Sequence, residues 1–328
     1  IFVFLISCCT NLFNPASPMK TKNVITLLAI PAMLFSCNEV KEKETASIDY
    51  PDTRKDTSVV DRYFDNEVKD PYRWLENDTS AETEAWVKAQ NEVAFGYLEK
   101  IPYRSSINER LTDLWNYERI SAPFVRGEYT YFFKNDGLQN QAVIYRQKGE
   151  EGTPEIFLDP NTFSDDGTTS LGGMSFTKDG SLIAYQISEG GSDWRKVIVM
   201  EAETKNIVED TLIDVKFSGL SWKGNDGFYY SSYDKPKDGS QLSGLTQYHK
   251  LFYHKLKTPQ ASDKLIFGGE KTPRRYVSGG VTEDENFLVI SAATSTTGNE
   301  LYIQDLRKPG SPIINLVNNF ENDHSVLH

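Results

Sequence analysis

The residue types that could perform catalysis form no complete catalytic motif in this chain of 328 residues. A nucleophile elbow has the pattern Gly-x-Ser-x-Gly, which holds its serine on a strained turn between a strand and a helix. Two segments, 190–194 (GGSDW) and 219–223 (GLSWK), begin this pattern but lack its final glycine. We therefore interpret Ser192 and Ser221 as turn or strand residues, and no sequence context indicates a histidine base held by a carboxylate. The residues by themselves predict no catalytic apparatus.

Metal and nucleotide chemistry find no support in the sequence either. His249 and His254 flank the apolar segment 251–253, and neither has the accompanying cysteine or carboxylate pattern of a metal site. We predict that these two histidines lie on the surface of a sheet. The chain also lacks GxxxxGK[ST] and GxGxxG, the glycine-rich motifs that bind nucleotide phosphates. The sequence therefore predicts no metal and no cofactor.

Composition excludes a further class of partner. The formal net charge is -12 and the pI is near 5.0, whereas binding to nucleic acid requires a basic face. We read the acidity as an aid to solubility. Cys8, Cys9 and Cys37 all precede the region that we expect to fold, so the sequence predicts neither a disulfide framework nor a cysteine zinc site.

Residues 19–37 have the features of an export signal. Lys20 and Lys22 give it a positive start, and residues 24–35 form an apolar run too short to span a bilayer. The segment 34–37 (LFSC) resembles a bacterial lipobox. We expect lipidation at Cys37, and a bacterial protein that is exported, either periplasmic or a membrane-anchored lipoprotein. The alternative is an ordinary cleaved signal peptide with a chance cysteine.

The segments on either side of this signal differ in character. Residues 38–49 are polar and charged, which is typical of a flexible linker. Residues 1–18 precede Met19 and begin with an apolar run. We interpret 1–18 as translated upstream sequence rather than native protein, with a longer signal as the alternative.

Residues 50–121 are expected to be mainly helical. Thr79 with Glu82, and Ser106 with Glu109, have the spacing of capping boxes at two helix starts. Each is followed by apolar residues at helical spacing. Two helices of this kind must pack against another part of a protein to bury their apolar stripes.

Residues 122–328 have a strand–turn–strand pattern that repeats. Turns of the Asp-Gly type occur at 136–137, 179–180 and 226–227, with a weaker one at 284–286. Their spacing, with several short strands in each unit, is typical of β-propeller blades. We predict about four blades, with a β-sandwich as the alternative.

Several segments resemble the prolyl oligopeptidase family. The signature 70–76 (DPYRWLE) is followed in order by matching segments at 137–141, 157–161, 171–180, 191–194, 215–218 and 251–254. The resemblance covers the chain from about Tyr50 to its end. It implies a mainly β fold, an incomplete seven-bladed propeller preceded by a helical segment that packs on an α/β-hydrolase domain absent from this chain.

The resemblance also implies a function. Such enzymes cleave short proline-containing peptides after proline with a Ser–Asp–His triad, and the propeller restricts access to the active site. The family's triad lies in its C-terminal half, so no catalytic residue is carried over, and we expect these residues alone to be inactive. We expect the complete enzyme to be a monomer. The alternatives are a non-catalytic propeller remnant that binds a peptide or protein, and a related oligopeptidase that cleaves after basic residues.

One substrate contact follows from the resemblance. Phe217, in 215–218 (VKFS), matches a propeller aromatic that faces the substrate pocket in relatives. The alternative is that Phe217 is a core aromatic of the third blade.

Overall fold

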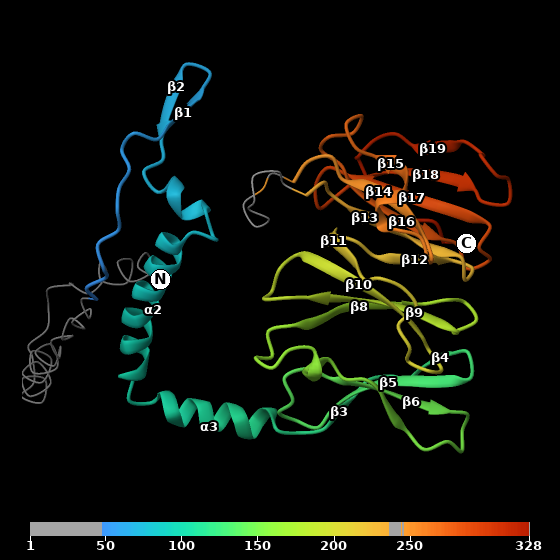
Figure 1. The fold of residues 1–328 in the computed structure, drawn as a ribbon, viewed down its shortest axis with the longest axis horizontal. Helices are drawn as coiled ribbons and strands as arrows, with labels where there is room; N and C mark the ends of the chain where they lie inside the picture. The colour runs from blue at the N-terminus through green and yellow to red at the C-terminus, as the bar shows by residue number, and fades with distance from the viewer. Residues whose placement is uncertain (1–47, 236–243, 245, 328) are drawn as a thin grey trace, which may run out of the picture. The chain divides into compact units, whose positions relative to one another are not determined.

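The computed structural model describes residues 48–235, 244 and 246–327 (Figure 1). The chain divides into two units, 1–49 and 50–328, of which the second is considered below. The predicted upstream segment 1–18, the signal at 19–37 with Cys37, and the linker up to residue 47 lie outside the described residues. In the described part, no helix is both long and apolar enough to cross a membrane.

The N-terminal part contains two strands and three helical segments. They are β1 (Val60–Tyr63), β2 (Asn66–Lys69), the 3-10 helix η1 (Arg73–Glu76), α2 (Ala81–Glu99) and α3 (Arg104–Trp115). The DPYRWLE segment forms η1, where Arg73 makes ion pairs with Asp61 and Asp70. Trp74 donates its indole N–H to the carbonyl of Arg54 at 3.0 Å. This signature therefore ties the β1–β2 hairpin and the preceding chain to the start of the helices.

The capping box predicted at Thr79 and Glu82 is wrong by one residue. Ser80 is the N-cap of α2, and its hydroxyl accepts the Thr83 backbone N–H at 3.1 Å. Glu82 instead pairs with Arg54 at 2.6 Å. A side-chain oxygen at the N-cap satisfies an amide that has no partner within the helix.

The second predicted box is also wrong. Helix α3 begins at Arg104, and Ser106 lies inside its first turn. The chain already turns directly after Pro102, since the Arg104 N–H donates to the carbonyl of Ile101 at 3.1 Å. The helix therefore starts before Ser106 and has no side-chain cap.

Four antiparallel sheets follow, three with four strands and one with five, and we number them blades 1 to 4 (Figure 1). Blade 1 contains β4 (Phe124–Arg126), β5 (Tyr129–Asn135), β6 (Val143–Lys148) and β7 (Glu155–Leu158), and β3 (Arg119–Ile120) also pairs with β5. Blade 2 contains β8 (Ser170–Phe176), β9 (Leu182–Ser188), β10 (Trp194–Glu201) and β11 (Leu212–Lys216). Blade 3 contains β12 (Leu220–Lys223), β13 (Gly227–Ser232), β14 (Lys250–Lys255) and β15 (Lys264–Gly268). Blade 4 contains β16 (Tyr276–Val281), β17 (Phe287–Ala293), β18 (Asn299–Asp305) and β19 (Ile313–Val317). Four separate sheets confirm the propeller blades and exclude the two-sheet sandwich.

The first of the predicted turns is out of register with the others. The turns at 179–180, 226–227 and 284–286 join the first and second strands of their blades, whereas 136–137 joins the second and third strands of blade 1. The equivalent turn in blade 1 contains Gly127, which has φ of 58°. A Cβ atom on Gly127 would lie 2.9 Å from the carbonyl oxygen of Asp179, so only glycine fits this close approach of two blades.

Hydrophobic cores fill the spaces between successive blades. The core between blades 1 and 2 contains Tyr131, Ile144, Phe157, Ile183, Tyr185 and Met200. The core between blades 2 and 3 contains Ala184, Val197, Val199, Leu212, Val215, Trp222, Phe228 and Tyr230. The core between blades 3 and 4 contains Tyr229, Leu251, Val277, Leu288, Ile290 and Ala292. Each blade is therefore stabilised mainly by its neighbours, as expected where sheets pack face to face.

Alternating strand direction gives every blade two distinct ends. The turns between first and second strands lie at one end, which we call the turn end. There Lys178 of blade 2 donates to the carbonyl of Glu283 of blade 4 at 2.9 Å. The loops between second and third strands and the connections between blades lie at the opposite end, which we call the connection end.

Candidate functional site

Phe217 lies in the short connection between β11 of blade 2 and β12 of blade 3, at the connection end. Its side chain is 45% exposed, so it is not a core residue of blade 3. Its ring packs edge-on against Tyr233, with 6.1 Å between ring centroids, and tilts against Tyr276 at 6.2 Å. We call these three residues the Phe217 cluster. The cluster brings together the connection of blades 2 and 3, the end of the second strand of blade 3 and the first strand of blade 4.

The backbone at Phe217 is strained. Its φ is 54°, in the left-handed region that non-glycine residues rarely adopt. Hydrogen bonds hold the next residue, because Ser218 Oγ accepts the Ser231 N–H at 2.7 Å and Gln186 donates to the Ser218 carbonyl at 2.9 Å. Strain of this kind costs about 1–3 kcal/mol and tends to cluster at functional sites. Phe64 and Tyr248 also combine an exposed ring with a positive φ, so the packing of the Phe217 ring on Tyr233 and Tyr276 is what makes Phe217 the candidate contact for a ligand.

His249 fixes the residue that precedes Phe217. Its Nδ1 accepts the Val277 N–H at 2.9 Å, so Nε2 carries the proton and donates to the Lys216 carbonyl at 3.1 Å. The side chain is 1% exposed, and its ring stacks on Tyr233 at 4.4 Å. Burial lowers the pKa of His249 to about 4, so the ring is neutral. The predicted surface role is wrong, because sequence alone gave no sign of these partners, the nearer of which is 28 residues away.

His254 is also buried, and the surface role predicted for it is wrong for a different reason. Its Nδ1 lies 2.7 Å from Asp263, and its Nε2 lies 3.2 Å from Glu209 in the loop that precedes β11 of blade 2. Burial alone would lower the pKa of His254, but hydrogen bonds to the two carboxylates outweigh burial and raise it to about 9. With both ring nitrogens donating to carboxylates, the imidazolium cannot accept a proton as a general base. It joins blades 2 and 3.

The two serines in partial elbow patterns have structural roles, as the sequence predicted. Ser221 Oγ in β12 accepts the Val281 N–H of blade 4 at 2.8 Å. Ser192 Oγ accepts the Trp194 N–H at 3.1 Å within a turn. Across the described ranges, no group of three or more histidine, cysteine or acidic side chains could hold a metal ion.

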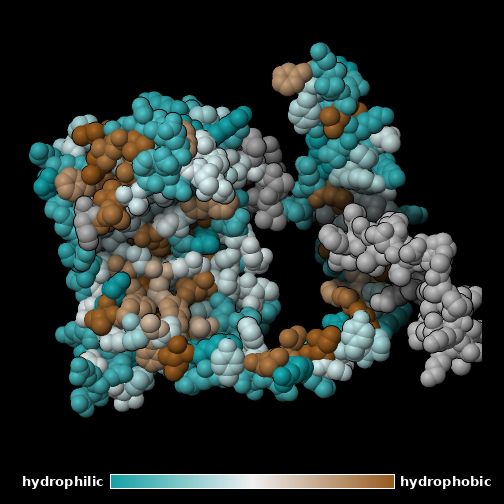
Figure 2. All heavy atoms as spheres, turned by 180° about the vertical axis from the view of Figure 1, so that it is seen from behind, coloured by the Kyte–Doolittle hydropathy of each residue, from teal (hydrophilic) through white to brown (hydrophobic). Residues whose placement is uncertain are grey.

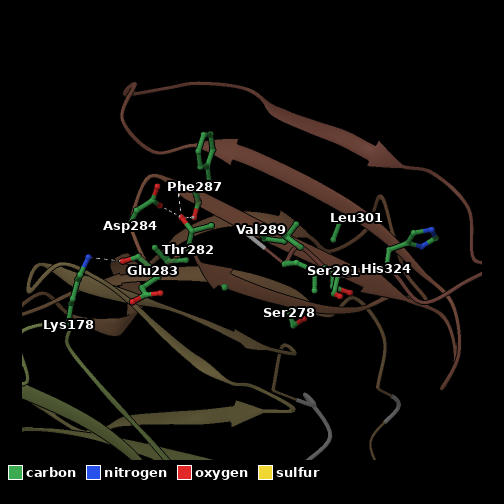
Figure 3. Close-up of a pocket in the computed structure, with 15 residues that line it drawn as sticks. Lys178, Ser278, Thr282, Glu283, Asp284, Phe287, Val289, Ser291, Leu301 and His324 are labelled. Atoms are coloured by element: carbon green, nitrogen blue, oxygen red, sulfur yellow. Dashed lines mark hydrogen bonds between the residues drawn. The ribbon is translucent and has the colours of Figure 1, made fainter. Parts of the chain in front are cut away.

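A cavity of about 900 Å³ lies over one face of blade 4 (Figure 3). Phe287, Val289 and Leu301 line it from β17 and β18, and the corresponding faces of blades 1 to 3 are covered by the next blade. Figure 3 shows Asp284 and His324 at opposite ends of this cavity, so they form no catalytic pair. We interpret the cavity as a packing surface rather than a reaction site.

The helices keep apolar side chains exposed. Helix α3 has no buried residue, and α2 buries only Thr83. The exposed apolar side chains of the two helices include Phe95, Ile107, Leu111, Leu114 and Trp115. Figure 2 shows such apolar atoms among hydrophilic ones along the helical segment. Exposed apolar stripes on stable helices indicate a packing partner.

Comparison with known proteins gives a consistent picture. Residues 51–328 match the family model for the N-terminal β-propeller domain of prolyl oligopeptidase. The chain is 55% identical over 296 residues to a prolyl endopeptidase of Elizabethkingia miricola, covering 90% of this chain and 42% of that protein. It is 52% identical over 299 residues to the prolyl endopeptidase of Elizabethkingia meningoseptica, covering 91% and 42%. The chain thus spans about two fifths of the length of these relatives.

A solved structure shows the same fold. Prolyl oligopeptidase B from Galerina marginata, bound to a 35-residue hydrolysis and macrocyclization substrate, superposes with a TM-score of 0.69 at 27% identity. The match covers 84% of this chain and 42% of that protein.

Proposed function

The chain belongs to the prolyl oligopeptidase family, and on that premise we propose that it forms the substrate-facing propeller of a serine endopeptidase that cleaves short peptides after proline. The observation that carries this proposal is Phe217, an exposed ring at the connection end that packs on Tyr233 and Tyr276. In the proposed enzyme this ring contacts the peptide, and the propeller restricts which peptides enter. An α/β-hydrolase domain outside this chain supplies the serine, aspartate and histidine.

The exposed apolar side chains of α2 and α3 support a docked hydrolase domain. Side chains such as Leu111 and Trp115 are more than half exposed, and another domain packed on them would remove that surface from water. We propose likewise that a further blade covers the face of blade 4 that lines the large cavity. These surfaces disfavour the alternative of a free-standing binding propeller.

Expression of residues 38–328 alone tests the need for these partners. We expect poor solubility and no cleavage of a Gly-Pro chromogenic substrate. A soluble, cooperatively melting protein that binds peptide without cleaving it would support the binding-propeller alternative instead.

The central test is Phe217→Ala in the complete enzyme. We expect KM for a Gly-Pro peptide to rise severalfold, while the melting temperature stays within about 1–2 °C, because an exposed ring contributes little to folding. Phe64→Ala, at a fully exposed phenylalanine of the β1–β2 turn, is the matched control and should leave KM unchanged. Unchanged KM in Phe217→Ala would count against the proposed substrate contact.

We further propose that the enzyme is exported and anchored through a lipid on Cys37. The apolar run 24–35 and the LFSC segment support this proposal. Metabolic labelling with radioactive palmitate should mark the wild-type protein and not Cys37→Ser. Labelling of both proteins, or of neither, would contradict a lipid on Cys37.

A further inference from the structure

Lys216 is a buried lysine beside the Phe217 cluster. It ends β11, directly opposite Trp194 in the register of β10 and β11. The residue is 7% exposed, and its Nζ lies 5.0 Å from the ring centroid of Trp194 and 5.1 Å from that of Phe217. The ammonium group is therefore held between a buried ring and an exposed one.

This ammonium has no oxygen partner among the residues that the structure describes. The backbone carbonyl of Lys216 accepts a hydrogen bond from His249, but no hydrogen bond or ion pair within the described residues involves the Nζ atom of Lys216. The acidic side chain nearest in sequence, Asp214, lies 3.6 Å from the Nζ of Lys235. Aromatic faces attract a cation but accept none of its N–H groups as a carboxylate would, so they offset only part of the cost of burial. The three N–H donors remain available to an anion.

Two neighbouring side chains hold Lys216 in position. His249, which is neutral, holds the Lys216 carbonyl, and Trp194 packs against the ammonium. Trp194 also lines a cavity of about 360 Å³ that includes Asp214 and Lys235. When a cation is already held in position on a rigid element, little further conformational entropy is lost as an anion binds to it.

We propose that Lys216 binds a carboxylate of the peptide while Phe217 contacts its apolar part, so that the enzyme prefers an anionic peptide. The inference rests on the peptidase function proposed above. The carboxylate is either an acidic side chain or the peptide's C-terminus. A lysine is a point charge without the fork of an arginine, so the interaction specifies charge rather than planar geometry.

The net charge of the chain makes this preference informative. At -12, the long-range field of the chain disfavours anionic peptides. Within this chain, a preference for them must therefore come from a local cation. Lys235→Met is the matched control, because it removes the same charge from a lysine of the neighbouring cavity that already pairs with Asp214.

The experiment measures kcat/KM and calorimetric affinity of the complete enzyme for blocked Gly-Pro peptides. One pair differs by Glu or Gln on the N-terminal side of Gly-Pro, and a second pair by a C-terminal acid or amide. We expect roughly tenfold preference for the anionic member of one pair, the usual effect of one hydrogen bond to a charged group. Which pair responds identifies the source of the carboxylate.

Lys216→Met should abolish the preference, Lys216→Arg should retain part of it, and Lys235→Met should leave it intact. Equal use of both members of both pairs by the wild type overturns the inference without requiring any variant. A preference that survives Lys216→Met also overturns it. Binding of an anionic peptide that depends on Lys216, without cleavage of any Gly-Pro peptide, would sustain the inference and reject the peptidase function.

Discussion

Two histidines, His249 directly before β14 and His254 near its end, show that partners, and not burial alone, decide the charge of a buried side chain. His249 and His254 are equally buried, at 1% exposure. His249 meets a backbone amide and a carbonyl, and its pKa falls to about 4. His254 meets two carboxylates, and its pKa rises to about 9. Both connect neighbouring blades, one as a neutral ring and the other as a cation. Acid pH should therefore weaken the connection at His249, and alkaline pH the connection at His254.

Removing the charged connection should have the largest effect. His254→Leu leaves Glu209 and Asp263 buried without their cation, and we expect a loss of about 3–5 kcal/mol in the free energy of unfolding. Urea denaturation of wild type and variant measures the loss. His249→Leu is the comparison, and it should cost about 1–3 kcal/mol because only neutral groups lose their partners. Equal losses in the two variants would break the comparison.

Alkaline pH should weaken the His254 connection. Its pKa is raised from about 6.5 to about 9, so its contribution is complete below pH 6.5 and is lost as pH rises to 9. The 2.5-unit difference corresponds to about 3 kcal/mol. Denaturant unfolding at pH values from 6 to 10 measures this decline, and His254→Gln should flatten it. A wild-type stability that stays constant over this range would mean that His254 is not charged in the folded protein.

Acid pH should weaken the His249 connection. Its pKa is lowered from about 6.5 to about 4, so its contribution is complete above pH 6.5 and is lost as pH falls toward 4. His249→Asn keeps one donor and one acceptor but does not titrate, so its stability should fall less than that of the wild type between pH 6.5 and 4. The same slope in both proteins would assign the acid sensitivity to other groups.

A third connection between blades contains no titratable group, and its removal should have the smallest effect on stability. Trp222 of blade 3 donates its indole N–H to the Ser175 carbonyl of blade 2 at 3.0 Å. Trp222→Phe should cost about 1–2 kcal/mol, since one buried neutral hydrogen bond is lost and the smaller ring fills less of the core between the blades. The cost should be the same at pH 5, 7 and 9 by urea denaturation. A cost that varies with pH would show that this junction is coupled to one of the histidines.

The sequence predicted the repeating strand–turn–strand units of blades 2 to 4, because apolar runs there are bounded by recognisable turns. It did not predict the outermost strands. Strands β7, β15 and β19 have four or five residues, and at most one side chain in each is buried, so they show no strong alternation. The turn at Gly127 was missed because it has no Asp-Gly pair, although contact with another blade requires its glycine.

The site was less predictable than the fold. Phe217 was identified by resemblance to a family and not by its own pattern. Its partners Tyr233 and Tyr276 lie in other segments of the chain, and only the packing of blades brings the three rings together. The carboxylate Glu209 is 45 residues from His254, so no local motif could reveal that ion pair.

The hydrogen bond from Lys178 to the Glu283 carbonyl joins residues 105 positions apart and passes over blade 3 entirely. Every hydrophobic junction links consecutive blades, so the sheets can dock one after another as the chain is synthesised. The Lys178 bond is different, because it joins blade 2 directly to blade 4. It forms only when blades 2, 3 and 4 have reached their final positions relative to one another. A pair of fluorescent labels at these two positions would therefore report the approach of blade 4 to blade 2, separately from the folding of any single blade.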